Sequence, residues 1–238
     1  MAAPRFATKR LAASILVLVS GILAGVSAFT PWWIASLSGS TTGSTDFYPG
    51  ASFSIVNSKG VVTWFTYASR PDVSSLSGIY EGVLAMTLVV LILALVVAAI
   101  GVLAATWHIR NPARHRLIML LIVVLFVISL IAIILVPVAQ PSSTTGCAGS
   151  GQTVCNSFWG SASGGGLSTM WGASAGWYLA IASAVVLVAA LFVWRSSSSE
   201  PWPVGPASVH AAPTMVTCAR CGQPRPWGQT PCPTCGGP

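Results

Sequence analysis

Long runs of apolar residues without a single charge dominate the first 195 residues of the chain. Four such runs contain no Asp, Glu, Lys, Arg or His, and they cover residues 11–29, 82–107, 117–138 and 176–194. Since a helix rises about 1.5 Å per residue and the hydrocarbon core of a bilayer is about 30 Å thick, about 17–25 residues are enough to cross it. None of the runs shows the polar stripe of a helix that packs on a soluble core. The pattern therefore predicts a mainly α fold, with a four-helix transmembrane bundle in a domain of residues 1–195.

The first run has a second interpretation. Arg5, Lys9 and Arg10 precede it, and Val26-Ser27-Ala28 near its end resembles a signal-peptidase site, so a cleaved signal peptide is the alternative. Its 19 residues exceed the usual apolar core of a signal, about 7–15 residues. Trp32-Trp33 follow it, where an interfacial aromatic belt is expected. We therefore expect a retained helix.

The predicted outer loop of residues 30–81 contains a strand pattern. Phe53–Val56 and Val61–Tyr67 are rich in β-branched and aromatic residues, and they flank the turn Asn57-Ser58-Lys59-Gly60. This pattern predicts a β-hairpin. Because a lone hairpin is only marginally stable, we expect it to extend into a small sheet that lies on the bundle. An unstructured loop is the alternative.

The predicted outer loop of residues 139–175 is free of charge and rich in Gly, Ser and Thr. Its two cysteines, Cys147 and Cys155, are expected to form a disulfide on the oxidising side of the membrane. The alternatives are two free thiols or pairing with another chain. The chain has no N-x-Ser/Thr glycosylation sequon, which favours a prokaryotic plasma membrane.

Small residues recur at helical spacing in three of the spans. Because small side chains let helix backbones approach closely in lipid, these stripes predict helix packing within the bundle or with another membrane subunit. Thr87, Ser129 and Ser183 are the polar residues deep in the last three spans, and we expect each hydroxyl to bond the carbonyl four residues earlier. The stripes are Gly21 and Gly25; Ala94, Ala98, Gly101 and Ala105; and Gly172, Gly176, Ala180 and Ala184.

Composition agrees with a membrane protein. Hydrophobic residues make up 54% of the chain and charged residues only 6%, and the mean hydropathy is +0.77. A soluble domain has roughly 25% charged residues. The formal net charge of +7 would suggest nucleic acid in a soluble protein, but here the cations border apolar runs. We therefore expect membrane lipid as a partner, and no nucleic acid.

The cations fall unevenly around the spans, and this asymmetry predicts an orientation. The side of the membrane with more Lys and Arg is the cytoplasmic one. Only Lys59 and Arg70 lie in the outer loops. We therefore expect both termini in the cytoplasm, since seven cations flank the other ends of the spans: Arg5, Lys9, Arg10, Arg110, Arg114, Arg116 and Arg195.

The C-terminal tail contains a four-cysteine pattern. Residues 196–217 form a Pro- and Ser-rich flexible linker, and the segment 218–238 follows. Two CxxC pairs, each followed by Gly, suit one tetrahedral structural zinc per chain, with Cys218, Cys221, Cys232 and Cys235 as ligands. Four protein ligands leave no open position for catalysis. Iron accepts the same ligands, and a redox-active cysteine pair is a further alternative.

These residues resemble the zinc-ribbon family, the rubredoxin-like zinc β-ribbons. The resemblance covers about residues 217–238, and the spacer of ten residues between the pairs is short for the family. It implies a small β-hairpin module that docks proteins or nucleic acid. Since Arg220 and Arg225 are its only cations, we expect a protein.

The membrane part is similar in architecture to the claudin and peripheral-myelin-protein group. The similarity rests on four spans, a β-rich first outer loop and Pro31-Trp32-Trp33 after the first span. That group has a Gly-Leu-Trp motif and two cysteines in its first loop. Here Gly60 to Trp64 is only a distant match, and the cysteines lie in the second outer loop. The function of that group is therefore not carried over.

Together these features favour a non-enzymatic membrane scaffold or accessory subunit, with the zinc-ribbon as an adaptor. A protein partner or a second copy is expected to bind through small-residue helix faces, the outer loops or the zinc-ribbon. The alternative is a small channel or transporter component, although no ionisable residue lies within the spans. No catalytic residue is expected, because the histidines and the acids of the outer loops lie on opposite sides: His108, His115 and His210 against Asp46, Asp72 and Glu81.

Overall fold

The computed structural model describes residues 8–39, 42–69, 74–106, 112–139, 157–164, 166–197, 215–218 and 220–226. The chain divides into two compact units. The larger unit comprises residues 6–200, and the smaller one comprises residues 1–5 with 201–238. Both cysteines of the predicted disulfide, Cys147 and Cys155, lie outside the described residues, as does most of the linker between 196 and 217.

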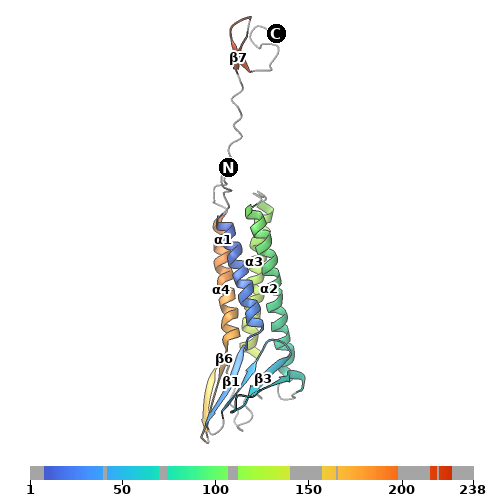
Figure 1. Cartoon of the computed structure of the whole chain (residues 1–238), viewed down its shortest axis with the longest axis vertical. Coiled ribbons are helices and arrows are strands. Elements are labelled where there is room, and N and C mark those ends of the chain that lie inside the picture. Colours follow the sequence, from blue (N-terminus) through green and yellow to red (C-terminus); the bar gives the residue numbers. More distant parts are fainter. Residues whose placement is uncertain are drawn as a thin grey trace. The chain divides into compact units, whose positions relative to one another are not determined.

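The four predicted membrane-length helices are confirmed (Figure 1). Each is long and apolar enough to cross a bilayer, so the chain is an integral multi-pass membrane protein. Two short 3-10 turns, η1 (Tyr67–Ser69) and η2 (Ser74–Leu76), precede the second helix. The helices are α1 (Thr8–Ala28), α2 (Ser77–Thr106), α3 (Pro112–Ala139) and α4 (Ala175–Ser196).

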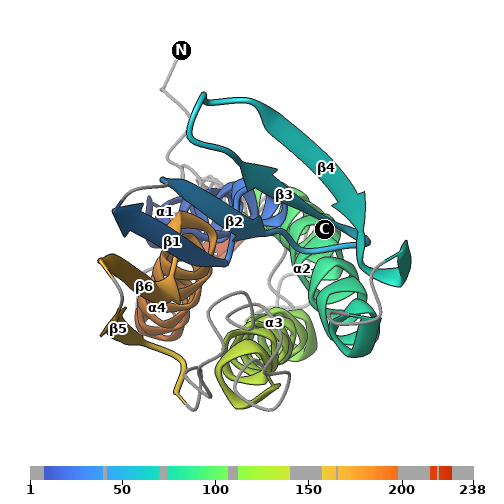
Figure 2. The same cartoon turned by 90° about the horizontal axis from the view of Figure 1, so that it is seen from below.

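Helix α1 packs between α2 and α4, and α3 closes the ring against the same two helices (Figure 2). The small-residue stripes form these contacts. A methyl group added to Gly21 would lie 2.7 Å from the Cβ of Ala94, and one added to Gly101 would collide with Ser14. Ala180 and Ala184 are likewise buried. The stripes on these helices are therefore used within the chain's own bundle, whereas Gly172 belongs to a strand.

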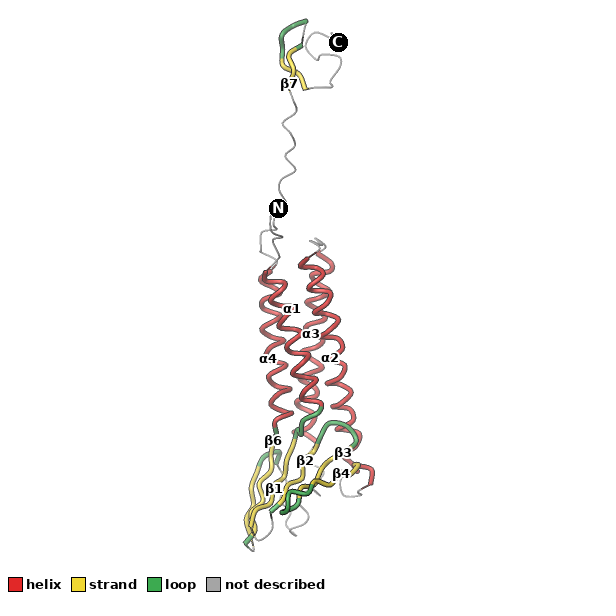
Figure 3. Tube along the Cα trace, viewed as in Figure 1, coloured by secondary structure: helices red, strands yellow, loops and turns green. Residues whose placement is uncertain are grey.

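Six strands form one antiparallel sheet beyond one end of the bundle (Figure 3). Their order is β4-β3-β2-β1-β6-β5. Four strands lie between α1 and α2, and two lie between α3 and α4. The sheet was expected in the first loop alone, but it extends into the second. The strands are β1 (Trp33–Gly39), β2 (Gly43–Phe47), β3 (Ser52–Val56), β4 (Val62–Thr66), β5 (Gly160–Gly164) and β6 (Leu167–Ala173).

The predicted hairpin is confirmed as β3 and β4, which pair from Val56↔Val62 to Ser52↔Thr66. Asn57 shapes its turn: its side-chain Oδ1 accepts hydrogen bonds from the N–H groups of Lys59 and Val61, each at 3.0 Å. Gly60 has a φ of +74°, a left-handed conformation that glycine adopts without strain. The Asn and Gly of the turn thus set the register of the two strands.

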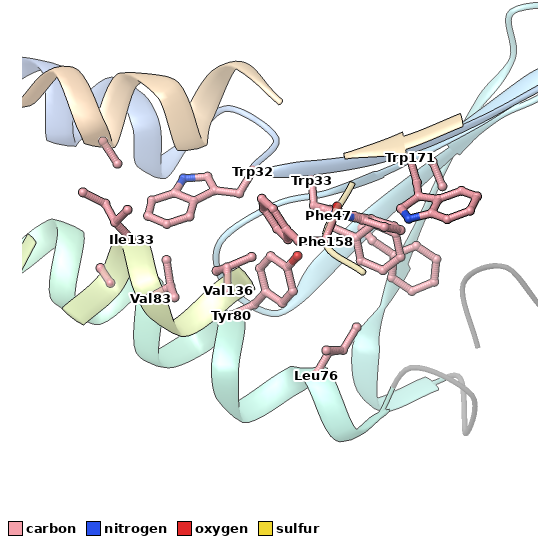
Figure 4. Packing of buried hydrophobic residues seen from close by; sticks show 14 of the residues in the cluster. Trp32, Trp33, Phe47, Leu76, Tyr80, Val83, Ile133, Val136, Phe158 and Trp171 are labelled. Carbon is pink, nitrogen blue, oxygen red and sulfur yellow. Dashed lines mark hydrogen bonds between the residues drawn. The ribbon is translucent and has the colours of Figure 1, made fainter. Parts of the chain in front are cut away.

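One face of the sheet packs on the bundle through aromatic rings (Figure 4). Phe47 lies at the centre of this cluster, 5.2 Å from the ring of Trp33 and 5.7 Å from that of Phe53. Tyr67 and Tyr80 stack beside it at 6.2 and 6.1 Å. The expectation that Trp32 and Trp33 form an interfacial belt is wrong, because both are buried, with 0% and 1% of their surfaces exposed.

Candidate interaction site on the extramembrane sheet

The second face of the sheet is mixed, because serines and Asp46 lie beside exposed Trp64 and Met170. Side chains alternate along a strand, so the residues between those of the aromatic cluster point the other way. Two of the serines on this face bond across β1 and β6: the Ser36 hydroxyl donates to the Met170 carbonyl, and the Ser38 hydroxyl to the Ser168 carbonyl, both at 3.3 Å. The polar residues of this face are Ser36, Ser38, Ser44, Asp46, Ser52, Ser54, Ser161, Ser163 and Ser168.

Strand β4 forms one edge of the sheet and carries large exposed apolar side chains. Val62 and Trp64 expose 49% and 56% of their surfaces, and Val61, which directly precedes the strand, exposes 54%. Among the residues that the structure describes, β3 is the one strand that neighbours β4. Trp64 is held on one side by the ring of Tyr48, 4.9 Å away. This edge therefore presents an exposed tryptophan that packs against Tyr48.

Asp46 introduces a charge into the sheet. Its Oδ1 atom is closed off from solvent and has no hydrogen-bond partner in the described part of the chain. Burial raises the pKa of this carboxyl above its ordinary value of 3.8, and a hydrogen bond from Ser44 partly offsets the rise. The ionised form of Asp46 is thus less favourable in the folded sheet than in water.

An indole N–H group joins the α1–α2 connection to the α3–α4 connection. Trp33 on β1 donates to the carbonyl of Phe158 at 3.0 Å, while Trp171 on β6 donates to the carbonyl of Ser157 at 3.0 Å within the α3–α4 connection. Backbone bonds complete the link where β6 turns into α4: Ser174 N–H donates to the Trp32 carbonyl at 3.0 Å, and Gly176 N–H to the Pro31 carbonyl at 2.8 Å. The sheet is therefore one unit made from both loops.

A further indole anchors α4 to α3 beneath the sheet. Pro137 lies inside α3 and has no N–H, so the carbonyl of Ile133, four residues earlier, lacks its usual helical donor. Trp177 of α4 supplies a replacement, because its Nε1 donates to the Ile133 oxygen at 3.0 Å. This bond satisfies a carbonyl at membrane depth, where an unsatisfied group costs several kcal/mol.

The middle of the bundle encloses a cavity of about 10 Å³, roughly the room for one water molecule. Ser27, Thr87, Ser129 and Ser183 line it, one from each helix. Thr87 and Ser129 bond the carbonyls of Val83 and Leu125, four residues earlier, as predicted. The prediction is wrong for Ser183, whose hydroxyl donates instead to the Ser20 carbonyl on α1 at 3.0 Å.

Two of the four predicted metal ligands lie in the described part of the tail. Strands β7 (Met215–Thr217) and β8 (Pro224–Pro226) pair antiparallel, and Cys218 and Cys221 occupy the turn between them. Cys218 is buried, its N–H donates to the Gln223 carbonyl at 2.9 Å, and its carbonyl accepts from Gly222 at 2.8 Å. Gly222 has a φ of +72°. The other predicted ligands, Cys232 and Cys235, lie outside the described residues.

Sequence reasoning missed the two strands of the second outer loop and their joining to β1. Gly and Ser dominate β5, which lowers its strand propensity. Leu167 to Ala173 contains the consecutive residues Thr169, Met170 and Trp171 between small residues, and this was the available signal for β6.

Comparisons with known proteins leave the family open: no family model matches the sequence, and no curated protein matches it significantly.

Proposed function

We propose that the protein is a non-enzymatic membrane scaffold or accessory subunit that binds a partner protein through the edge of its extramembrane sheet. The observation that carries the proposal is the row of exposed apolar residues on β4, above all Trp64 with 56% of its surface exposed. Tryptophan is among the residues most enriched in binding hot spots.

The rigidity of the sheet supports this role. A scaffold binds well when its contact surface is already ordered, because little conformational entropy is then lost on association. Here the edge strand is continuous through β3 and β2 with the buried cluster around Phe47, which packs on the helices. Movement of Trp64 relative to the membrane is therefore small.

The cysteine segment is proposed as a zinc-ribbon that acts as a second, cytoplasmic docking module. Its support is the hairpin turn around Cys218 and Cys221, in which Gly222 takes the left-handed conformation that lets the chain fold back. Paired with Cys232 and Cys235, the two thiolates would complete a four-sulfur structural site for zinc, or for iron. The cytoplasmic placement of the tail rests on the cation asymmetry of the sequence.

Photo-crosslinking in native membranes tests the scaffold proposal. A photoreactive residue replaces Val62 on β4 or, as a matched control, Phe192 on α4, which is also apolar and exposes 67% of its surface. We expect one adduct of defined mass from position 62 and none of that mass from position 192. An adduct of twice the chain's 24.6 kDa identifies a second copy as the partner. Equal yields from both positions, or none from position 62, would overturn the proposal.

The second candidate, a small channel or transporter component, has the small cavity inside the bundle as its support, although the four hydroxyl groups around that cavity already donate to backbone carbonyls. Ion flux through proteoliposomes that contain the purified chain alone would establish it. Absence of flux together with the position-62 adduct would decide for the scaffold.

Metal analysis tests the adaptor. The purified chain should contain about one zinc or iron per molecule, and the Cys218→Ser variant should lose it, because three thiolates hold a structural metal far less well than four. Equal metal content in both proteins would remove the zinc-ribbon from the proposal and leave the sheet-based role untouched.

A further inference from the structure

The end of the bundle that lies away from the sheet is strongly basic. This basic end comprises the start of α1, the end of α2, the start of α3 and the end of α4. No Asp or Glu occurs there among the described residues, and Glu200 is the only acid in the flanking segments 1–10, 107–116 and 195–200. The described cations of this end are Lys9 and Arg10 on α1, Arg114 and Arg116 on α3, and Arg195 on α4.

Specific contacts bring these cations together around the last turn of α4. The Lys9 Nζ donates to the carbonyl of Ser196 at 3.5 Å. Trp194 Nε1 donates to the carbonyl of His115 at 3.2 Å, and the two rings stack with centroids 5.5 Å apart. Arg10 lies within electrostatic reach of His115. Cations from α1 and α3 therefore meet on either side of α4.

Most of this charge is accessible. Lys9, Arg114, Arg116 and Arg195 are exposed and Arg10 is half-buried. Successive residues of a helix are about 100° apart around its axis, so Arg114 and Arg116 lie on the two flanks of His115, which faces Trp194. Two guanidinium groups therefore flank the half-buried imidazole of His115, which stacks on the buried ring of Trp194.

The helix dipoles add to the positive potential. Both α1 and α3 begin at this end, with no acidic residue in their first turns. A helix N-terminus carries a partial positive charge, and cations placed there are electrostatically unfavourable. Lys9, Arg10 and Arg114 occupy such positions. A bound anion would relieve this repulsion at both helices.

We propose that the basic end binds the phosphate headgroup of an anionic phospholipid, such as phosphatidylglycerol. Lipid is favoured over a soluble anion because the cations border membrane-spanning helices, where headgroup phosphates lie. Exposed apolar side chains continue from the site along the helices and suit acyl chains: Leu117 and Leu120 on α3 and Phe192 on α4. The inference does not rest on the proposed scaffold role.

Lipid retention by the full chain tests the site. The chain is placed in nanodiscs of phosphatidylcholine containing a minor fraction of phosphatidylglycerol, released, and analysed by native mass spectrometry. We compare Arg10→Gln/Arg195→Gln with Lys59→Gln, which removes an exposed cation from the β3–β4 turn. Since each cation near the surface changes affinity about fivefold, the double variant should retain about 25-fold less phosphatidylglycerol, and Lys59→Gln should match the wild type.

A displacement control and a salt titration complete the test. Soluble glycerol phosphate should not displace the retained lipid, because it lacks the acyl contacts; displacement would show a free-phosphate site and overturn the lipid assignment. If the double variant fails to fold, the wild type alone decides, since its phosphatidylglycerol retention should fall steeply as salt rises. The proposal would be contradicted if the wild type retained phosphatidylglycerol no better than phosphatidylcholine. It would also be contradicted if Lys59→Gln and the double variant lost equal amounts of retained phosphatidylglycerol.

Discussion

The two ends of the bundle are completed in different ways. At the sheet end, aromatic rings stack on one another and indole N–H groups donate to backbone carbonyls of the same chain. The bonds from Trp33 to Phe158 and from Trp177 to Ile133 are examples. At the basic end, exposed cations such as Arg114 and Arg195 surround one buried tryptophan, Trp194. The difference teaches that the sheet end is held by packing within the chain, whereas the basic end presents exposed cations to its surroundings.

The largest test of the packed end is the removal of Trp33. Trp33→Ala should lower the free energy of unfolding of the sheet by about 3–5 kcal/mol, because it empties the cluster and breaks the bond to the second loop. Hydrogen exchange should rise in both outer loops and little in the middle of the helices. Trp64→Ala, a change of the same size on the surface, should stay within about 0.5 kcal/mol. Similar losses in both variants would contradict a core at Trp33.

The junction of β1 and α4 gives the second test. A methyl group on Gly176 would lie 2.6 Å from the Thr30 carbonyl oxygen and 2.8 Å from that of Pro31. Since backbone cannot move aside easily, Gly176→Ala should lower the free energy of unfolding by about 1–3 kcal/mol. Gly78→Ala is the control: it meets nothing within 4 Å and should stabilise α2 by up to about 1 kcal/mol. Thermal unfolding in detergent measures both, and equal shifts would refute the close approach.

The Trp177 bond allows a double-mutant cycle. Trp177→Phe should cost about 1–3 kcal/mol, because the Ile133 carbonyl loses its only replacement donor. In a Pro137→Ala background the cost should be smaller, since residue 137 then supplies its own N–H to that carbonyl. Identical costs in the two backgrounds would show that the tryptophan acts through packing alone.

The smallest effect concerns the one acid of the sheet strands, Asp46. Its raised pKa means that the charged form destabilises the fold, so the wild type loses stability as pH rises above 3.8 and through the raised value. Asp46→Asn should therefore unfold at a higher temperature than the wild type at pH 7, with the gap closing near pH 3.5. A variant that is less stable at neutral pH would show that the carboxylate is stabilised instead.

The helices were predictable because a charge-free apolar run of about 20 residues matches the thickness of a bilayer and is rare in soluble domains. The β3–β4 hairpin was predictable from Asn57 and Gly60, whose turn chemistry is local. The joining of the second loop was not, since β6 pairs with β1 across more than a hundred residues of sequence and no local pattern encodes that contact.

The tryptophans show the same limit at the site itself. Trp32 and Trp33 follow an apolar run, and sequence position alone suggested a lipid interface, but the indole partners that bury them come from Ser27 and from Phe158. The Phe158 partner is fixed only once the sheet is assembled. The candidate binding edge at Trp64 was within reach of the sequence as a strand, but its exposure depends on β4 being the last strand of the sheet.

The central claim, that both outer loops build one sheet, is tested most directly by an engineered disulfide between β1 and β6. Ser36 and Met170 lie directly opposite each other, so the pair Ser36→Cys/Met170→Cys should oxidise readily. Mass spectrometry of a non-reduced digest should find the peptides of positions 36 and 170 linked. Ser36→Cys/Ser161→Cys, whose positions are two strands apart, should give no such link. Linkage in the second pair but not the first would contradict the account.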